Sequence, residues 1–236
     1  MLIAGLDSTA VTASASIVEI NDGKVSTFSL FTVKNKLTHS EILLPLLENA
    51  LEQYGAKISD VDLFAVSAGP GSFTGVRIGA ATVKGLAFAQ NKPCVSVSAL
   101  EAIAKNVGRG YVLAVMDARR DQFYTALFKN GERISEDRAL SAQEIYEELK
   151  DIPEVTVCGD GTEKFISLCE GAHNLFEASI ASRDQNALSV AILGFEKYIK
   201  GETVTAKELK PIYLRMPQAE REKLEREKAR KEEEKK

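Results

Sequence analysis

Two aspartates end apolar segments in a way that could support phosphate chemistry. Asp7 closes "LIAGLD" and Asp117 closes "VLAVMD". A carboxylate at the end of a buried strand can hold a metal-bound phosphate or act as a base. The simpler alternative is that each aspartate accepts hydrogen bonds within its own turn. The sequence leaves both interpretations open.

The glycine-rich corner "SAGPGSFTG" is a second candidate for anion binding. Gly69 and Gly71 turn the chain there, and Ser72 is placed to cap a helix whose free N-terminus would offer N–H groups. The corner does not match the standard nucleotide or esterase motifs. It has no P-loop lysine, Thr74 stands where a dinucleotide fingerprint has its third glycine, and Phe73 stands where an esterase elbow has its serine.

A basic pair, Arg119 and Arg120, follows Asp117 directly and precedes Asp121. This cluster either faces a polyanion or pairs internally across a turn. The residues that we expect to face an anion or a nucleotide are Asp7, Ser8, Gly69, Gly71, Ser72, Asp117 and Arg119.

Composition argues against several classes of protein. The chain has 236 residues, of which 44% are hydrophobic and 27% charged, and a net charge of -4. Such a mildly acidic chain is not expected to bind nucleic acid strongly by itself, because phosphate contacts need clustered Lys and Arg. No apolar run is long enough to span a bilayer, the N-terminus does not resemble a signal peptide, and three scattered cysteines do not suggest a disulfide framework. We therefore expect a cytoplasmic protein without membrane contact.

Metal chemistry is also poorly supported. The two histidines, His39 and His173, lie far apart and lack metal-ligand spacing. Cys158 and Cys169 lack the paired spacing of a zinc site. We expect no metal site in this chain.

The elements that would position these residues follow an α/β pattern that occurs twice. Strands at 2–7, 13–20 and 24–33 precede a helix at 37–56, a buried strand at 61–69 and a second helix to about residue 91. Capping boxes support two helix starts, at Thr38 with Glu41 and at Ser141 with Glu144.

The segment from Val112 repeats the pattern of strand, aspartate, turn and strand that begins at Leu2. This favours two duplicated lobes, although any two α/β segments share some likeness. The predicted limits are 1–107 and 108–217 for the lobes, and 218–236 for a charged tail that is helical or disordered.

Each of the first two long helices carries more apolar residues than a single core-facing side requires. A glycine ridge, Gly75 and Gly79, would let a partner helix approach the second helix closely, although the same glycines could simply fit that helix against its own sheet. The pattern favours the partner slightly. The predicted interface residues are Ile42, Leu44, Leu51, Gly75, Val76, Gly79, Thr82, Val83 and Leu86.

Several motifs resemble one known family over nearly the whole chain except the charged tail. "GLDSTA", "HSEILLPLL", "SAGPGSFTGVRIG", "KGLAF", "VMDARRDQFYTALF", "GDG" and "PIYLR" are similar to those of the TsaB (YeaZ) family, which is glycoprotease-like. The resemblance implies an actin-like, Hsp70-like (ASKHA) fold of two duplicated α/β lobes. It also implies a non-catalytic subunit that acts with TsaD and the ATPase TsaE. The complex transfers threonylcarbamoyl from threonylcarbamoyl-AMP to a tRNA adenosine beside the anticodon.

The resemblance implies further expectations about partners and cofactors. TsaD would dock on the first two helices as a heterodimer, and the same helices would form a homodimer in its absence. The chain would have no cofactor of its own, since ATP and a metal would belong to partner subunits, and tRNA would be reached through the complex. The TsaD metal motif is absent, because Leu43 stands where the second histidine would follow His39.

A different class of function stays as the alternative. In an ATP-dependent phosphotransferase of the same fold, a nucleotide site between the lobes would be lined by Asp7, Asp117 and the glycine corners Gly69–Gly71 and Gly159–Gly161. No lysine is placed for phosphates and no distinct base is apparent, which argues against it.

Overall fold

A computed structural model describes residues 1–35 and 37–215 of the chain. The predicted tail at 218–236 lies outside the described residues, so that prediction is not addressed by the structure.

The first lobe is built on a five-stranded mixed sheet of order β3-β2-β1-β4-β5. The strands β1, β2 and β3 pair antiparallel, whereas β4 and β5 continue the sheet parallel to β1. The bounds are β1 Leu2–Asp7, β2 Thr12–Asn21, β3 Lys24–Lys34, β4 Leu63–Gly69 and β5 Cys94–Ser98. The hairpin predicted at the N-terminus is confirmed.

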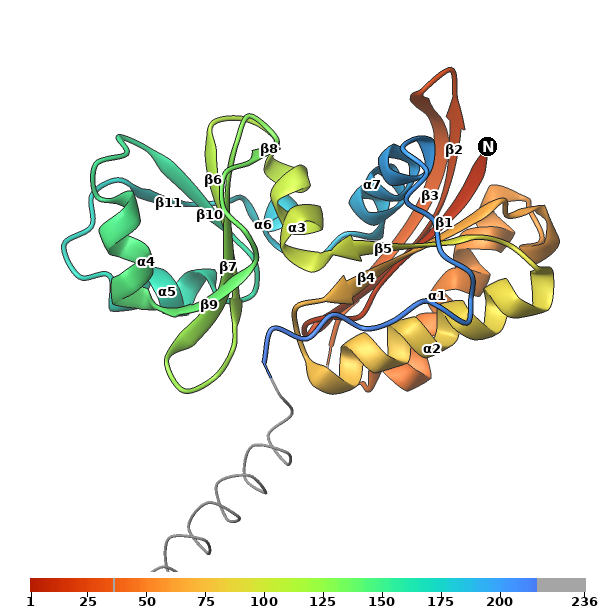
Figure 1. The fold of residues 1–236 in the computed structure, drawn as a ribbon, viewed down its shortest axis with the longest axis horizontal. Helices are drawn as coiled ribbons and strands as arrows, with labels where there is room; N and C mark the ends of the chain where they lie inside the picture. Colours follow the sequence, from red (N-terminus) through yellow and green to blue (C-terminus); the bar gives the residue numbers. More distant parts are fainter. Residues whose placement is uncertain (36, 216–236) are drawn as a thin grey trace, which may run out of the picture.

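Helices cover both faces of this sheet, because alternate side chains of a strand point to opposite faces. Ala4 and Leu6 pack in one core with α1 (His39–Tyr54) and α2 (Phe73–Gln90). Ile3 packs on the other side with α7 (Ala187–Ile199). A short helix, η1 (Ile58–Asp60), precedes β4. Figure 1 shows α1 and α2 together on one face and α7 on the other.

The second lobe repeats the arrangement with the order β11-β10-β6-β7-β8, and β9 pairs with β7. Its strands are β6 Tyr111–Asp117, β7 Gln122–Lys129, β8 Glu132–Arg133, β9 Arg138–Ser141, β10 Val155–Cys158 and β11 Leu175–Glu177. Its helices are α3 (Ala99–Val107) and α6 (Ile180–Arg183) on one face, and α4 (Ala142–Leu149) and α5 (Thr162–Leu168) on the other.

The two sheets share one topology, since β6, β7, β8, β10 and β11 take the places of β1, β2, β3, β4 and β5. This confirms the duplicated, actin-like (ASKHA) α/β architecture. The packing nevertheless crosses the predicted boundary at residue 107. Helix α3 packs on the second sheet, α7 returns to the first sheet, and Val204 forms a bridge with Cys94 of β5. Helices α3 and α7 contact each other between the sheets (Figure 1).

Local signals explain where the two long helices of the first lobe begin and end. The Glu41 carboxylate accepts a hydrogen bond from the Thr38 backbone N–H at 3.0 Å, which caps α1. Gly55 ends α1 at a φ of 82°, in the left-handed region. The Ser72 hydroxyl accepts a hydrogen bond from Gly75 N–H at 3.3 Å and caps α2.

Two further observations concern the membrane and the cysteines. None of the helices in the described residues has both the length and the hydropathy that a bilayer span requires. The cysteines, Cys94, Cys158 and Cys169, are buried and unpaired.

Candidate functional site

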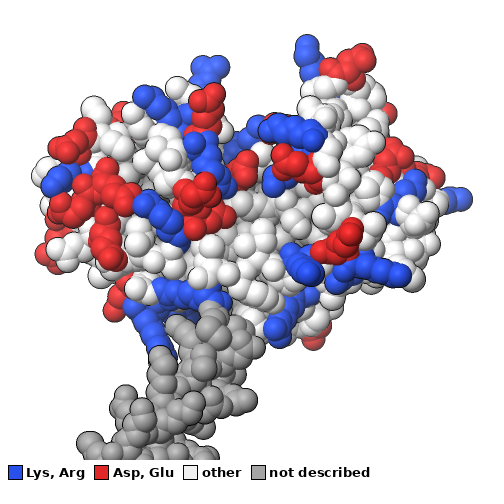
Figure 2. Space-filling model, viewed as in Figure 1, with Lys and Arg blue, Asp and Glu red and all other residues white. Residues whose placement is uncertain are grey.

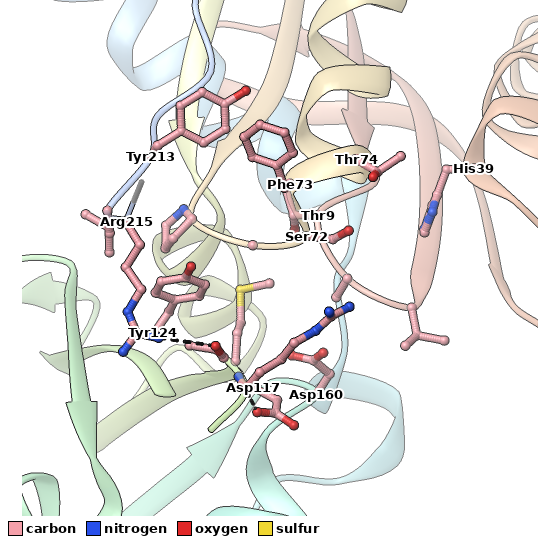
Figure 3. A pocket seen from close by; sticks show the side chains of 18 of the residues that line it. Thr9, His39, Ser72, Phe73, Thr74, Asp117, Tyr124, Asp160, Tyr213 and Arg215 are labelled. Atoms are coloured by element: carbon pink, nitrogen blue, oxygen red, sulfur yellow. Dashed lines mark hydrogen bonds between the residues drawn. The ribbon is translucent and has the colours of Figure 1, made fainter. Parts of the chain in front are cut away.

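The main cavity of the described residues lies between the lobes and has a volume of about 710 Å³. Several turns, helix starts and one extended segment line it, and Asn35, Leu37 and His39 at the entry to α1 are among the lining residues. The other lining elements are the β1–β2 turn, the start of α2, the β6–β7 turn, the corner at Asp160, and the extended segment 212–215, which we call the strap. Figure 3 shows side chains from both lobes facing this cavity, with Asp117 and Asp160 together on one side of it.

Asp7 does not face this cavity. It is fully buried, and its carboxylate accepts hydrogen bonds from Thr9 N–H at 2.9 Å, Thr9 Oγ1 at 2.7 Å and Ser67 Oγ at 2.5 Å. Burial raises the pKa of Asp7, while these hydrogen bonds oppose the rise. The structure therefore supports the simpler interpretation, in which Asp7 organises its own turn, and corrects the expectation that it faces an anion.

Ser8 and the glycine ridge form an internal contact. A Cβ atom at Gly75 would overlap the carbonyl oxygen of Ser8, and one at Gly79 would lie 2.7 Å from Ser8 Oγ. The Ser8 hydroxyl donates a hydrogen bond to the Gly75 carbonyl oxygen at 2.9 Å. The glycines let α2 approach the β1–β2 turn of its own lobe, so the ridge faces inward, contrary to the expected outward face.

Three other predicted interface residues are also internal. Val76 is 1% exposed, Val83 is 0% exposed, and Leu51 is buried in the core below α1. They complete the apolar contact between the helices and the sheet. Their side chains are buried within the lobe itself, which corrects their assignment to the interface.

The outward side of the two helices carries the rest of the predicted interface. Leu44 is 43% exposed, while Ile42, Thr82 and Leu86 are half-buried. The sequence analysis missed Ala81, Gly85 and Phe88, of which Phe88 is 67% exposed. The signal was present: residues 78, 81, 82, 85 and 88 recur at helical spacing and are small or apolar.

The corner at Gly69 holds the strap in place. Gly69 has a φ of 123°, and a Cβ atom there would overlap the carbonyl oxygen of Ile212. Ile212 N–H donates to the Ala68 carbonyl oxygen at 2.7 Å. Tyr213 stacks against Phe73 with ring centroids 5.0 Å apart. The strap therefore crosses the start of α2 at the mouth of the cavity.

Gly71 and Ser72 line the cavity, but Ser72 offers no free backbone N–H. Its N–H donates to the Thr9 carbonyl oxygen at 2.6 Å. The corner expected to bind an anion is thus joined to the β1–β2 turn by a backbone hydrogen bond.

Asp117 and Arg119 both line the cavity, as expected for residues that face a ligand. The Asp117 carboxylate accepts a hydrogen bond from Arg119 N–H at 2.8 Å and lies 3.4 Å from Lys164 Nζ. Asp121 also pairs with Lys164, at 3.3 Å. In the described part of the chain, Lys164 therefore pairs with both carboxylates of this turn, and the arginines pair with neither.

Asp160 is a functional candidate that the sequence analysis did not single out. It lines the cavity, and its Oδ1 atom is buried without a hydrogen-bond partner among the described residues. Burial, followed by the charge of Asp117, raises the pKa of Asp160 to about 6. Only its place in the glycine corner at 159–161 marked it in the sequence.

Neither a lysine nor a metal cluster marks this cavity in the part of the chain that the structure describes. No lysine is among the lining residues, and no group of three or more His, Cys, Asp or Glu side chains is arranged to hold a metal ion there.

Comparisons with known proteins agree on one family. The family model described as TsaD, tRNA N6-adenosine threonylcarbamoyltransferase, matches residues 34–159. A Bacillus subtilis protein named tRNA threonylcarbamoyladenosine biosynthesis protein TsaB is 32% identical over 231 residues, which cover 93% of this chain and 96% of the relative. The Escherichia coli protein of the same name is 27% identical over 230 residues, covering 91% and 95%.

A solved structure shares the whole architecture. YeaZ from Pseudomonas aeruginosa superposes with a TM-score of 0.73 at 26% identity and covers 90% of this chain and 99% of its own. Sequence, fold and coverage therefore agree, and the chain belongs to the TsaB (YeaZ) family, which is related to the TsaD glycoprotease family.

Proposed function

We propose that this chain is a non-catalytic subunit in threonylcarbamoyladenosine modification of tRNA, and that it docks on a TsaD-type catalytic subunit. The observation that carries this proposal is the outward face of α1 and α2. TsaE would act in the same complex as its ATPase, and transfer from threonylcarbamoyl-AMP would take place on the TsaD-type subunit, in the cytoplasm.

The docking face is the part of the outward side of α1 and α2 that carries small and apolar residues. Helices α1 and α2 contact each other on one face of the first sheet. Leu44 protrudes from α1, and Ala81, Gly85 and Phe88 protrude from α2. The small residues would let a partner helix approach closely, and Leu44 and Phe88 would supply apolar area at its margins. The same face could join two copies when the partner is absent.

The state of the candidate catalytic groups supports a scaffold role. Asp7 accepts two hydrogen bonds from Thr9 in its own turn and one from Ser67 of β4, so its carboxylate is occupied within the lobe. Asp117 is paired with Lys164. We therefore assign the ATP and the metal of the reaction to the partner subunits, with no cofactor held by this chain.

The test is a substitution in the middle of the docking face. Ala81→Arg places a charged side chain on α2, while Ala181→Arg makes the same change at an exposed alanine of α6 and is the matched control. We expect Ala81→Arg to weaken assembly with TsaD at least about tenfold, which corresponds to about 1.4 kcal/mol. Isothermal titration and gel filtration measure this, with circular dichroism as the check on folding. Unchanged assembly of a folded Ala81→Arg protein would refute the docking face.

An ATP-dependent phosphotransferase remains the alternative, and the cavity between the lobes is the observation in its favour. Titration of the isolated chain with ATP, together with a turnover assay, separates the two functions. Robust ATP hydrolysis or phosphoryl transfer by this chain alone would favour the alternative.

A further inference from the structure

The β6–β7 turn presents two arginines to solvent in an unusual backbone conformation. Arg119, Arg120 and Asp121 are all exposed and have φ values of 63°, 54° and 54°. Residues other than glycine seldom adopt this region, and such strain is concentrated at functional sites. Within the described chain, neither guanidinium forms an ion pair, because Lys164 engages both Asp117 and Asp121. The alternative in which the arginines pair across the turn is thereby removed.

A third arginine reaches the same turn from the far end of the described chain. Arg215 Nη1 donates a hydrogen bond to the Ala118 carbonyl oxygen at 3.3 Å, and its guanidinium lies 5.8 Å from the ring centre of Tyr124. Arg119 and Arg215 therefore both line the cavity at this turn, and Arg120 is exposed on the same turn. We call these three residues the arginine rim. Figure 2 shows basic side chains grouped on the second lobe close to where the described chain ends.

Aromatic rings lie beside these arginines along the cavity. Tyr213 is 40% exposed and lies next to Phe73, while Tyr124 lines the opposite wall. Figure 3 shows Phe73 and Tyr213 close together, and Tyr124 beside the Arg215 side chain. Arginines interleaved with exposed aromatic rings are typical of surfaces that bind unpaired RNA, because bases stack on rings while phosphates pair with guanidinium groups.

The carboxylates decide which part of a nucleotide could enter the cavity. Asp117 and Asp160 lie together, away from the rings of Phe73 and Tyr213 (Figure 3). Their charge would repel a phosphate from this region, so phosphates would stay at the arginine rim. A base could enter instead, because the Asp160 side chain lines the cavity and a carboxylate can accept a hydrogen bond from an exocyclic amine.

We propose that this rim binds an unpaired RNA strand, with phosphates on Arg119, Arg120 and Arg215 and one base against Tyr213. This inference rests on the proposed function, in which tRNA is the substrate of the complex, and adds a direct contact between the RNA and this chain. The net negative charge of the whole chain does not oppose it, because the three arginines lie at one turn. An acidic peptide fits less well, since it offers no planar group to the rings and meets two carboxylates in the cavity.

The first experiment measures binding of the full chain to a fluorescently labelled, unmodified anticodon stem–loop RNA by anisotropy at several salt concentrations. The variant is Arg119→Gln/Arg120→Gln. The matched control, Arg109→Gln/Lys129→Gln, removes the same charge from exposed positions at the opposite end of the β6–β7 hairpin. Each lost phosphate contact on a single strand should reduce the slope of log affinity against log salt by about 0.7.

We expect the rim variant to bind at least about tenfold more weakly, with a salt slope reduced by about 1.4, and the control to bind as the wild type does. Equal losses in both variants, or no loss in the rim variant, would overturn the proposal.

Competition identifies the ligand class. We expect an unlabelled single strand to displace the labelled RNA, and a blunt duplex of equal length, ATP or a polyglutamate peptide to displace it at least about tenfold less well. Displacement by any of these three at the concentration of the single strand would overturn the assignment to unpaired RNA. Tyr213→Ala should weaken binding, because it removes the ring on which a base would stack, and unchanged affinity would overturn the role of the ring.

Assembly with TsaD, measured on the same variants by gel filtration, separates this inference from the proposed function. The rim variant should assemble with TsaD as the wild type does but should lose RNA binding. If Ala81→Arg instead retains assembly while the rim variant loses RNA, the docking face fails and the RNA contact stands.

Discussion

Helix α2 contains two glycines at which one identical substitution should have opposite effects. At Gly75, an alanine Cβ would overlap the carbonyl oxygen of Ser8, which belongs to the backbone of the neighbouring turn. At Gly85, no atom beyond its chain neighbours and the surrounding helix backbone lies within 4 Å of the Cβ position. Gly75→Ala and Gly85→Ala therefore test directly which side of the helix is packed.

The magnitudes follow from the two environments. Replacing glycine by alanine inside a helix stabilises it by about 1 kcal/mol, so Gly85→Ala should raise the free energy of unfolding by about 0.5 to 1 kcal/mol. Gly75→Ala must displace backbone, which costs about 1 to 3 kcal/mol, and strains the hydrogen bond from Ser8 Oγ to the Gly75 carbonyl, worth about 1 kcal/mol. Less helix propensity is recovered near the N-terminus, and we expect a net loss of about 2 to 3 kcal/mol.

Urea unfolding followed by circular dichroism measures both changes, and thermal melts check them. For a chain of this size, each kcal/mol shifts the melting temperature by about 2 to 4 °C. The measurements should be repeated at two protein concentrations, because self-association would make the apparent stability depend on concentration.

Two results would refute this reasoning. A Gly75→Ala protein with the wild-type urea midpoint would show that the glycine ridge is not tightly packed on Ser8. A Gly85→Ala protein less stable than the wild type would show that Gly85 is not in open space within its own lobe.

Two further predictions concern the cavity and the strap. Burial raises the pKa of Asp160 in the folded state to about 6 from 3.8, so the folded state binds this proton more tightly than the unfolded state does. The resulting stabilisation is fully present below about pH 4 and is lost as the pH rises through 6. In urea unfolding, Asp160→Asn should therefore have a free energy of unfolding up to about 3 kcal/mol higher than the wild type at about pH 8, and the same value at about pH 4. The same difference at both pH values would contradict this. Tyr213→Ala should release the strap from Phe73, so trypsin should cleave after Arg215, at the end of the strap, several-fold faster, whereas Tyr198→Ala, a change at an exposed tyrosine of α7, should leave the cleavage rate unchanged. Equal cleavage rates in the two variants would show that the ring does not hold the strap.

Much of the architecture could be predicted because it is encoded locally. Period-two alternation marked β1 to β3, Thr38 with Glu41 marked the start of α1, and Gly55 marked its end. The repeated order of strand, aspartate and turn indicated the duplication that the two sheet orders confirm. The predicted boundary at 107 did not anticipate that α7 returns to the first sheet, because an apolar helix stripe does not specify which sheet it covers.

The candidate site could be predicted only in part. Asp117, Gly71, Ser72 and Arg119 do line the cavity, whereas Asp7 is occupied by hydrogen bonds from its own turn and from Ser67. The carboxylate at the end of a buried strand looks the same in the sequence whether its partners are a ligand or nearby hydroxyl groups.

By itself, the sequence determined the elements, their caps and the family, because those depend on residues close together in the chain or on an extended pattern of motifs. Only the tertiary structure decided which side of α2 is buried, since Gly75 and Gly79 on one side and Ala81 and Gly85 on the other are equally small. It also brought Arg215 to the turn after β6, across 97 positions of sequence separation. Helical periodicity defines the stripes of a helix, but the surface that each stripe meets is decided when the chain closes on itself and buries the stripe that fits.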